Sequence, residues 1–238
     1  MLRLDRWLVT LGVGSRSQVQ KLIRQGAVTL GGAVVTDPSA SCNTEAELTL
    51  HRQPLDGRLT RHVMLHKPAG LLTAARDKKQ PTVMDLLPES YASIGCMPVG
   101  RLDKDTTGLL FLTTDGELNH RLLSPTRHVD KTYLAQVDGE LTQADVEAFA
   151  QGLHLSDFDA KPALLEIVAP RTGRVTVQEG KFHQVKRMFS AVGKEVVQLH
   201  RESFGSLRLD PDLPVGEWRE LTDDELRSLY ADAQMEAP

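Results

Sequence analysis

The first apolar positions of the chain have the spacing of two helices. The first stripe stands at positions i, i+3, i+4 and i+7 and comprises Leu4, Trp7, Leu8 and Leu11. The second stripe comprises Val19, Leu22 and Ile23. Ser15 and Gln18 precede the second stripe with the S-x-x-Q spacing of a capping box, which marks a helix start. The pattern therefore predicts two short amphipathic helices near the N-terminus.

Two short β-prone runs follow these helices, at residues 27–30 and 33–35, and Gly31-Gly32 joins them. Glycine tolerates the positive φ angles that tight hairpin turns require, so the pattern predicts a β-hairpin. Residues 1–51 are thus predicted to form a small domain of helix, helix and hairpin. Residues 52–61 are polar, contain proline and glycine, and are predicted to be a linker.

The remainder, residues 62–238, contains more strand patterns than helix patterns. The β-prone runs are residues 62–66, 109–113, 132–137, 163–168, 174–178 and 196–200. The helical patterns are residues 117–123, 142–151, 183–192 and 222–231. Since the helices do not alternate regularly with the strands, we expect an α+β fold with a mixed, mainly antiparallel sheet rather than a doubly wound nucleotide-binding fold.

Composition and charge place the chain among cytoplasmic globular proteins. No apolar run approaches the roughly 20 residues of a membrane span, and the N-terminus lacks a signal-peptide cleavage site. The two isolated cysteines suit a reducing compartment. The net charge of −4 disfavours a nucleic-acid partner at first sight, but residues 209–238 hold nine acids and two bases. The first 36 residues hold five bases and one acid, which is either a phosphate-binding face or an ordinary solvated one.

Three segments carry candidate chemistry. The first, residues 100–110 (GRLDKDTTGLL), is a polar loop before an apolar strand. Asp103 and Asp105 lie two positions apart and are expected to point to opposite sides of the chain, so that one carboxylate would act alone. The alternative is that both acids merely cap a turn. The second, residues 131–137 (KTYLAQV), is a strand in which Tyr133 is either a core residue or a stacking surface for an extruded base. The third, residues 179–189 (EGKFHQVKRMF), begins a helix.

Lys186 and Arg187 lie off the buried stripe of that helix, where they are either solvated or near an anionic group. The sequence contains no motif for binding a nucleotide cofactor or a metal ion. It contains neither the G-x-x-x-x-G-K-[ST] loop nor the G-x-G-x-x-G loop of nucleotide-binding proteins. The eight histidines show no H-x-x-x-H or H-E-x-x-H spacing, so no metal site is expected.

The N-terminal segment RLDRWLVTLGVGSRSQVQKLIRQGAVTLGGAVVTDPS resembles the S4 (alpha-L type) RNA-binding domain over nearly its whole length. Gly31 departs from the family, which often has a polar residue there, but it preserves the turn. In that family the second helix and the preceding loop hold structured RNA through its phosphates. The resemblance implies that RNA is contacted by Arg3, Arg16, Lys21 and Arg24.

The three chemical segments, with HKPAG at residues 66–70 and RESFGSLRL at residues 201–209, resemble the ribosomal small-subunit pseudouridine synthase A family. The resemblance implies that Asp103 is the catalytic carboxylate, that Lys186 is its cation and that Tyr133 stacks on the target base. Asp103 would attack or stabilise ribose C1′, or remove a ribose proton. The resemblance also implies RNA binding by Arg101, Lys67, His183, Gln184 and Arg187. Phe182 and Lys186 stand where the family often has Tyr and Arg.

The expected activity is isomerisation of a uridine, by resemblance uridine 516 of 16S ribosomal RNA, without a cofactor. The expected partner is 16S rRNA, free or in a partly assembled small subunit, and the protein is expected to be a monomer that binds no membrane. Three alternatives remain open: a sibling enzyme of large-subunit rRNA, a non-catalytic S4-type RNA-binding protein, and a nucleoside hydrolase or glycosidase. The last is disfavoured because no second facing carboxylate is predicted.

Overall fold

The computed structural model describes residues 1–237, and the chain divides into two compact units. The first unit contains Met1–Arg61 together with Leu87–Met97, and the second contains His62–Leu86 and the chain from Pro98 onward. Each unit has its own hydrophobic core. The sequence did not predict that a segment as distant as Leu87–Met97 packs with the first unit.

The first unit contains the two predicted helices, the hairpin and two small sheets. Its helices are α1 (Leu4–Thr10), α2 (Arg16–Arg24) and α3 (Glu89–Ser93). Its strands are β1 (Leu2–Arg3), β2 (Val28–Leu30), β3 (Ala33–Val34), β4 (Ser41–Cys42), β5 (Leu48–Leu50) and β6 (Gln53–Leu55). The capping box is confirmed: Ser15 Oγ accepts from the Gln18 N–H at 3.4 Å, and Gln18 Oε1 accepts from the Ser15 N–H at 2.8 Å. The stripe of α1 forms the core with Val19 and Ile23 of α2, Val28 and Leu48, while Leu22 is only partly buried.

The predicted linker, residues 52–61, is wrong over part of its length. Gln53–Leu55 pairs antiparallel with β5 as an edge strand, where Pro54 is tolerated because one side of an edge strand needs no ladder hydrogen bond. The indole N–H of Trp7 donates to the carbonyl of Gly57 at 2.8 Å. Residues 53–57 therefore belong to the folded first unit.

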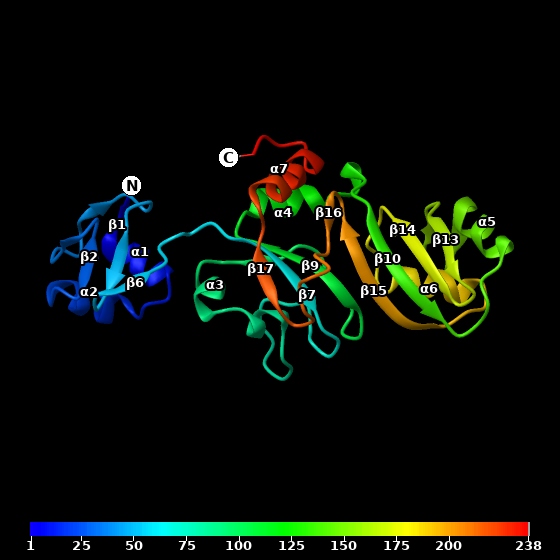
Figure 1. Ribbon diagram of the computed structural model, residues 1–238, viewed down its shortest axis with the longest axis horizontal. Coiled ribbons are helices and arrows are strands. Elements are labelled where there is room, and N and C mark those ends of the chain that lie inside the picture. The colour runs from blue at the N-terminus through cyan, green and yellow to red at the C-terminus, as the bar shows by residue number, and fades with distance from the viewer. Residues whose placement is uncertain (238) are drawn as a thin grey trace. The chain divides into compact units, whose positions relative to one another are not determined.

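The second unit is built on a nine-stranded sheet of the predicted mixed, mainly antiparallel kind (Figure 1). The strands along its main path run in the order β13-β14-β10-β15-β9-β7-β17, and β9 with β15 is the parallel pair. Its strands are β7 (His62–Lys67), β8 (Met97–Pro98), β9 (Thr107–Thr113), β10 (Lys131–Val137), β13 (Leu164–Ala169), β14 (Thr172–Val177), β15 (Val196–Phe204), β16 (Leu207–Arg208) and β17 (Trp218–Glu220). A separate two-stranded hairpin comprises β11 (Leu153–His154) and β12 (Asp159–Ala160).

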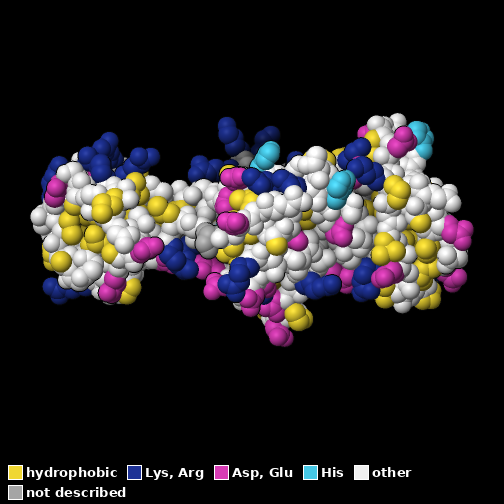
Figure 2. All heavy atoms as spheres, turned by 90° about the horizontal axis from the view of Figure 1, so that it is seen from above, with side chains coloured by type: hydrophobic (Ala, Val, Ile, Leu, Met, Phe, Trp, Pro, Cys, Tyr) yellow, Lys and Arg dark blue, Asp and Glu magenta, His cyan; other side chains and the backbone are white. Residues whose placement is uncertain are grey.

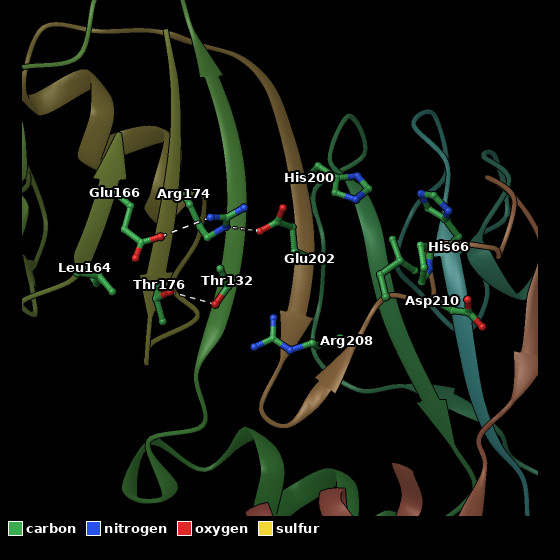
Figure 3. A pocket seen from close by; sticks show the side chains of 12 residues that line it. His66, Thr132, Leu164, Glu166, Arg174, Thr176, His200, Glu202, Arg208 and Asp210 are labelled. Carbon is green, nitrogen blue, oxygen red and sulfur yellow. Dashed lines mark hydrogen bonds and ion pairs between the residues drawn. The ribbon is translucent and has the colours of Figure 1, made fainter. Parts of the chain in front are cut away.

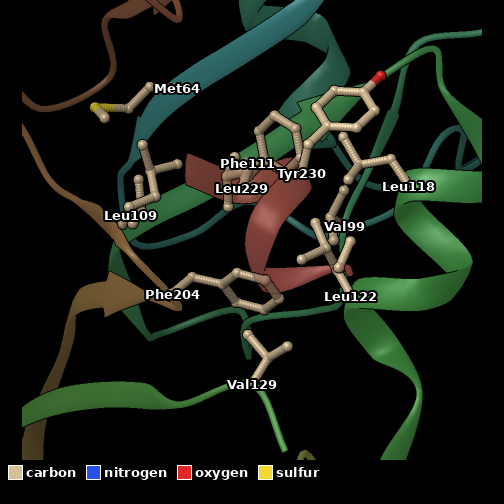
Figure 4. Close-up of a cluster of buried hydrophobic side chains, with 12 residues drawn as sticks. Met64, Val99, Leu109, Phe111, Leu118, Leu122, Val129, Phe204, Leu229 and Tyr230 are labelled. Atoms are coloured by element: carbon tan, nitrogen blue, oxygen red, sulfur yellow. The ribbon is translucent and has the colours of Figure 1, made fainter. Parts of the chain in front are cut away.

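All four helices predicted in this region are confirmed. They are α4 (Gly116–Leu123), α5 (Gln143–Gln151), α6 (Gln184–Ala191) and α7 (Asp223–Asp232), with short 3-10 turns at Val83–Leu86 and Pro125–Arg127. One hydrophobic core lies between α4, α7 and the strands β7 and β9 (Figure 4). Its largest side chains include Phe111, Phe204 and Tyr230. No helix in the described part of the chain is long and apolar enough to span a membrane.

Alternation along the strands gives the two faces of the sheet different roles. On β10, Tyr133, Ala135 and Val137 are buried, whereas Thr132 and Leu134 are only partly buried. The buried face of this half of the sheet is covered by α5 and α6, whose Phe149 and Phe189 rings lie 4.9 Å apart. This alternation with a period of two is the pattern that predicted the strand, and it determines which side chains face α6.

Gly108 lies at the one parallel contact of the sheet and has no room for a side chain. Its φ is +105°, and a Cβ there would lie 2.3 Å from the carbonyl oxygen and 2.5 Å from the nitrogen of Arg201. Because both atoms are backbone, the strands β9 and β15 would have to separate. We expect Gly108→Ala to lower the free energy of unfolding by on the order of 3–5 kcal/mol.

Denaturant unfolding of the whole protein measures this loss. Gly116→Ala is the matched control, because a Cβ at Gly116 has nothing within 4 Å and lies in the first turn of α4. We expect that control to unfold at the wild-type denaturant concentration or slightly above it. Equal stability of the two variants would show that β9 and β15 do not approach so closely.

Candidate active site

A short loop, residues 101–106, connects β8 to β9 and carries Asp103. The Thr106 N–H donates to the carbonyl of Asp103 at 3.1 Å, which closes a turn. Thr73 clamps the preceding residue, because its hydroxyl donates to the Leu102 carbonyl at 2.8 Å and accepts from the Leu102 N–H at 3.2 Å. The loop is therefore fixed by buried hydrogen bonds on both sides of Asp103.

Lys67 holds the same loop from the interior. Its ammonium donates to the carbonyls of Thr106 at 2.9 Å, Pro68 at 3.0 Å and Lys104 at 3.3 Å. Lys67 is completely buried, and this corrects the expectation that it binds RNA. Burial lowers its pKa to about 8, although the charges of Asp105 and Asp103 act in the opposite direction.

Two basic side chains of the α6 segment, Lys186 and His183, flank Asp103. Lys186 Nζ lies 3.2 Å from Asp103 Oδ2, and His183 Nε2 lies 3.4 Å from Asp103 Oδ1. The three side chains are between a fifth and two fifths exposed, so the cluster is open to a substrate. Residues 80 or more positions apart in sequence thus meet at one carboxylate, as the resemblance implied for Lys186.

The expectation that Asp103 and Asp105 point to opposite sides is wrong. Lys186 Nζ also lies 2.6 Å from Asp105 Oδ1. The loop turns between these two residues, so the alternation of an extended chain does not apply. The hydrogen bond from Lys186 lowers the pKa of Asp105. Burial alone would lower the pKa of Lys186, but the two carboxylates outweigh it and raise that pKa. Lys186 is therefore held as a cation next to Asp103.

A pocket of about 60 Å³ opens at this cluster. Tyr133 reaches it from β10, and Leu199 lines it from β15. Arg101 lines the same pocket with an exposed side chain. Tyr133 is thus a buried residue of β10 that also lines the pocket, and its stacking on a base stays a prediction.

Gln184 and Arg187, which were also expected to bind RNA, both interact with other side chains of the protein. Gln184 lines the pocket but is buried, and its amide bonds Glu179 Oε2 and the Lys181 N–H, both at 3.1 Å. Arg187 does not line the pocket and instead pairs with Asp157 on the loop between β11 and β12. These interactions position the start of α6, and RNA binding by the partly exposed Arg187 stays a prediction.

The four basic residues of the first unit that are expected to contact RNA are exposed. Arg3, Arg16, Lys21 and Arg24 all lie at its surface, and Figure 2 shows lysine and arginine side chains gathered mainly along one edge of this unit. Asp5 is buried and accepts two hydrogen bonds from Arg3 at 3.0 Å, which hold its pKa well below the usual range. Arg3 is thereby fixed in direction while its side chain stays half exposed.

A larger groove, of about 700 Å³, lies on the opposite face of the sheet (Figure 3). Arg174 there pairs with Glu202 at 2.8 Å and with Glu166 at 3.4 Å, so one guanidinium is shared by two acids. His66 and His200 meet edge to face with ring centroids 5.5 Å apart. The groove is larger than the pocket at Asp103, but Asp103, Tyr133 and Lys186 are not among its lining residues. The described residues contain no group of three or more His, Cys, Asp or Glu arranged to hold a metal ion.

Sequence reasoning missed two features of the site. It did not identify the loop-clamping role of Lys67 or of Thr73. The signal for Lys67 was present, because a lysine that ends a strand of buried residues must satisfy its charge inside the protein. No local signal marks Thr73, which lies 29 residues from its partner.

The mixed sheet carries a carboxylate loop that faces a lysine, and comparison with known proteins identifies the class of protein. Residues 61–191 match the RNA pseudouridylate synthase family, and residues 2–48 match the S4 domain. The chain belongs to the RNA pseudouridine synthases that carry an N-terminal S4 domain.

Full-length relatives and a solved structure agree with this assignment. The chain is 42% identical over 234 residues to ribosomal small subunit pseudouridine synthase A of Pseudomonas aeruginosa, with 96% of this chain and 100% of that protein covered. It is 40% identical over 232 residues to the Escherichia coli K12 protein of the same description, with the same coverage. It is 42% identical to an uncharacterized RNA pseudouridine synthase, YtzG, of Bacillus subtilis, covering 96% and 98%. A crystal structure of a pseudouridylate synthase superposes with a TM-score of 0.69 at 38% identity, covering 96% and 100%.

Proposed function

We propose that this enzyme converts uridine 516 of small-subunit (16S) ribosomal RNA to pseudouridine, with Asp103 as nucleophile. The observation that carries the proposal is the placement of Asp103, which lies against Lys186 and His183 at a pocket lined by Tyr133. The small-subunit substrate is supported by the descriptions of the Pseudomonas aeruginosa and Escherichia coli relatives, which match along their entire length.

The isomerisation needs bond exchange at one carbon and no outside group. An oxygen of Asp103 bonds to ribose C1′ as the C1′–N1 bond breaks, and N1 leaves with the electron pair. The uracil turns in the pocket, C5 bonds to C1′ and displaces the carboxylate, and the C5 proton leaves while N1 gains one. Atoms and electrons balance without a redox step, so the reaction requires no cofactor.

The neighbours of Asp103 have complementary roles in this scheme. Lys186 Nζ, 3.2 Å from Asp103 Oδ2, pairs with the carboxylate and orients it for the attack. Tyr133 presents its ring to the extruded uracil. Arg101, exposed at the pocket, occupies the space left by the flipped nucleotide or holds the flanking phosphates.

The S4 unit brings the rRNA to this site. Its exposed cations, Arg3, Arg16, Lys21 and Arg24, bind phosphates, since such contacts supply affinity without reading sequence. RNA of this kind is recognised largely by its folded shape, so a partly assembled small subunit is a suitable substrate. We propose that the enzyme acts there as a cytoplasmic monomer.

Tritium release tests the substrate. Small-subunit and large-subunit rRNA, each labelled with tritium at uracil C5, are incubated separately with the purified enzyme, as free RNA and as partly assembled particles. We expect release of one equivalent from the small-subunit substrate alone. Release from large-subunit rRNA alone would overturn the substrate and keep the chemistry, whereas no release from any substrate would overturn the proposed activity.

A further inference from the structure

Phe182 stands apart from the other aromatic residues of the described chain. Its side chain is 76% exposed, and it is the one aromatic among the exposed large hydrophobic residues in the part of the chain that the structure describes. It lies between Lys181 and His183, both of which line the catalytic pocket. A large apolar ring left in water beside a catalytic pocket is a candidate contact for ligand.

The ring of Phe182 continues inward as a stack. It lies on the His183 ring with the centroids 3.8 Å apart and the planes inclined by 18°. His183 Nε2 in turn lies 3.4 Å from Asp103 Oδ1. The backbone of His183 has φ of +50°, an uncommon conformation for a residue other than glycine. Two rings therefore lead from solvent to the catalytic carboxylate, and the outer face of Phe182 is open.

We propose that this outer face of Phe182 is a stacking subsite for an unpaired nucleobase that neighbours the target uridine. The proposal rests on the RNA pseudouridine synthase activity. When a uridine leaves its stack, the adjacent bases lose a stacking partner, and an aromatic side chain at the pocket replaces it without regard to base identity. The ring of Phe182 has the required exposure and position.

The charges around Phe182 favour a nucleotide over an apolar peptide as the occupant. Lys181 is exposed, and its ammonium lies 4.0 Å from the centroid of the Phe158 ring. Arg101 is exposed at the same pocket. A nucleobase on Phe182 would bring its phosphates to the pocket that the exposed cations Lys181 and Arg101 line, and stacking beside such cations is the usual combination in single-stranded RNA sites.

The first test separates binding from chemistry. Phe182→Leu keeps an apolar side chain and removes the π face, while Phe182→Tyr keeps both. On an rRNA fragment that the wild type converts, we expect Phe182→Leu to raise KM by about tenfold with kcat within about twofold, and Phe182→Tyr to match the wild type. Leu164→Ala, which removes an exposed apolar side chain from the opposite face of the sheet, is the control and should change neither constant.

The second test detects the stack itself. A fluorescent 2-aminopurine replaces, one at a time, each base flanking the modified uridine, and its fluorescence is followed on binding. We expect one position to be quenched by the wild type and by Phe182→Tyr but not by Phe182→Leu. Equal quenching by all three proteins, or a fall in kcat at unchanged KM, would overturn the subsite. Tritium release by the wild type on the same fragment establishes the activity independently, so a failure of the subsite is distinguishable from a failure of the proposed function.

Discussion

Asp103→Asn is expected to lower kcat by about 1,000-fold or more while leaving the dissociation constant for rRNA within about threefold of the wild type. The amide keeps the size of the carboxylate, but it cannot attack C1′ or carry the negative charge that Lys186 and His183 face. Binding is spared because the exposed cations of the first unit are unchanged. Tritium release and filter binding of the same labelled RNA measure the two quantities.

Asp105→Asn is the matched control for this variant. It removes a carboxylate from the same loop and from the same lysine, because Lys186 Nζ lies 2.6 Å from Asp105 Oδ1. Asp105 is three-quarters exposed, so its loss should reduce kcat by less than about tenfold. Comparable losses in the two variants would mean that the cluster acts through its net charge and that Asp103 has no special role.

Lys67→Met is expected to lower kcat by about 100-fold and to destabilise the protein by on the order of 2–4 kcal/mol. Methionine fills the buried space but takes the ammonium away from three backbone carbonyls, two of them in the loop that carries Asp103; of the three, the Lys104 carbonyl keeps the Gly70 N–H as a donor. A nucleophile displaced by about 1 Å loses much of its effectiveness, which explains the effect on kcat. Single-turnover kinetics and denaturant unfolding measure the two losses.

Lys131→Met is the control that separates the loss of the loop contacts from the loss of any buried lysine. Lys131 is also buried, and its ammonium donates to backbone carbonyls of Val129 at 2.7 Å and Gln178 at 3.4 Å, outside the catalytic loop. We expect this control to lose stability but to retain kcat within about threefold. If both variants lost kcat equally, the loop-clamping role of Lys67 would be refuted.

The pH dependence of the wild type supplies a second check on Lys67. Burial lowers the pKa of Lys67 from 10.5 to about 8, so the folded protein loses this proton at a lower pH than the unfolded chain does. Between these values the unfolded chain binds more protons, and the contribution of Lys67 to the free energy of unfolding rises with pH. The loop meanwhile loses its ammonium, so kcat should fall with a midpoint near pH 8, and Lys67→Met should show no such fall. A flat wild-type profile to pH 9.5 would contradict this role.

The arrangement of helices and strands was largely predictable because its signals are local. The stripes that include Trp7 and Ile23 have a period of 3.6, and the alternation around Tyr133 has a period of two. Edge strands were harder. Gln53–Leu55 is three residues long and contains proline, so no alternation could mark it.

The candidate site was predictable only as far as its motifs extended. The meeting of Lys186 with Asp103 followed from the family resemblance, since no local rule brings residues so distant in sequence together. Conversely, applying strand alternation to the loop gave the wrong direction for Asp105, because the chain turns there. The buried state of Lys67 depends on carbonyls that converge only after the strands have paired.

Mapping pseudouridine in small-subunit rRNA tests the central claim most directly. The rRNA is incubated with the wild type or with Asp103→Asn, treated with a carbodiimide that marks pseudouridine, and read by primer extension. We expect one new stop, at uridine 516, with the wild type and none with the variant. An equal stop with both proteins, or no stop with the wild type although the RNA is bound, would contradict the assignment of Asp103 as the nucleophile of a small-subunit pseudouridine synthase.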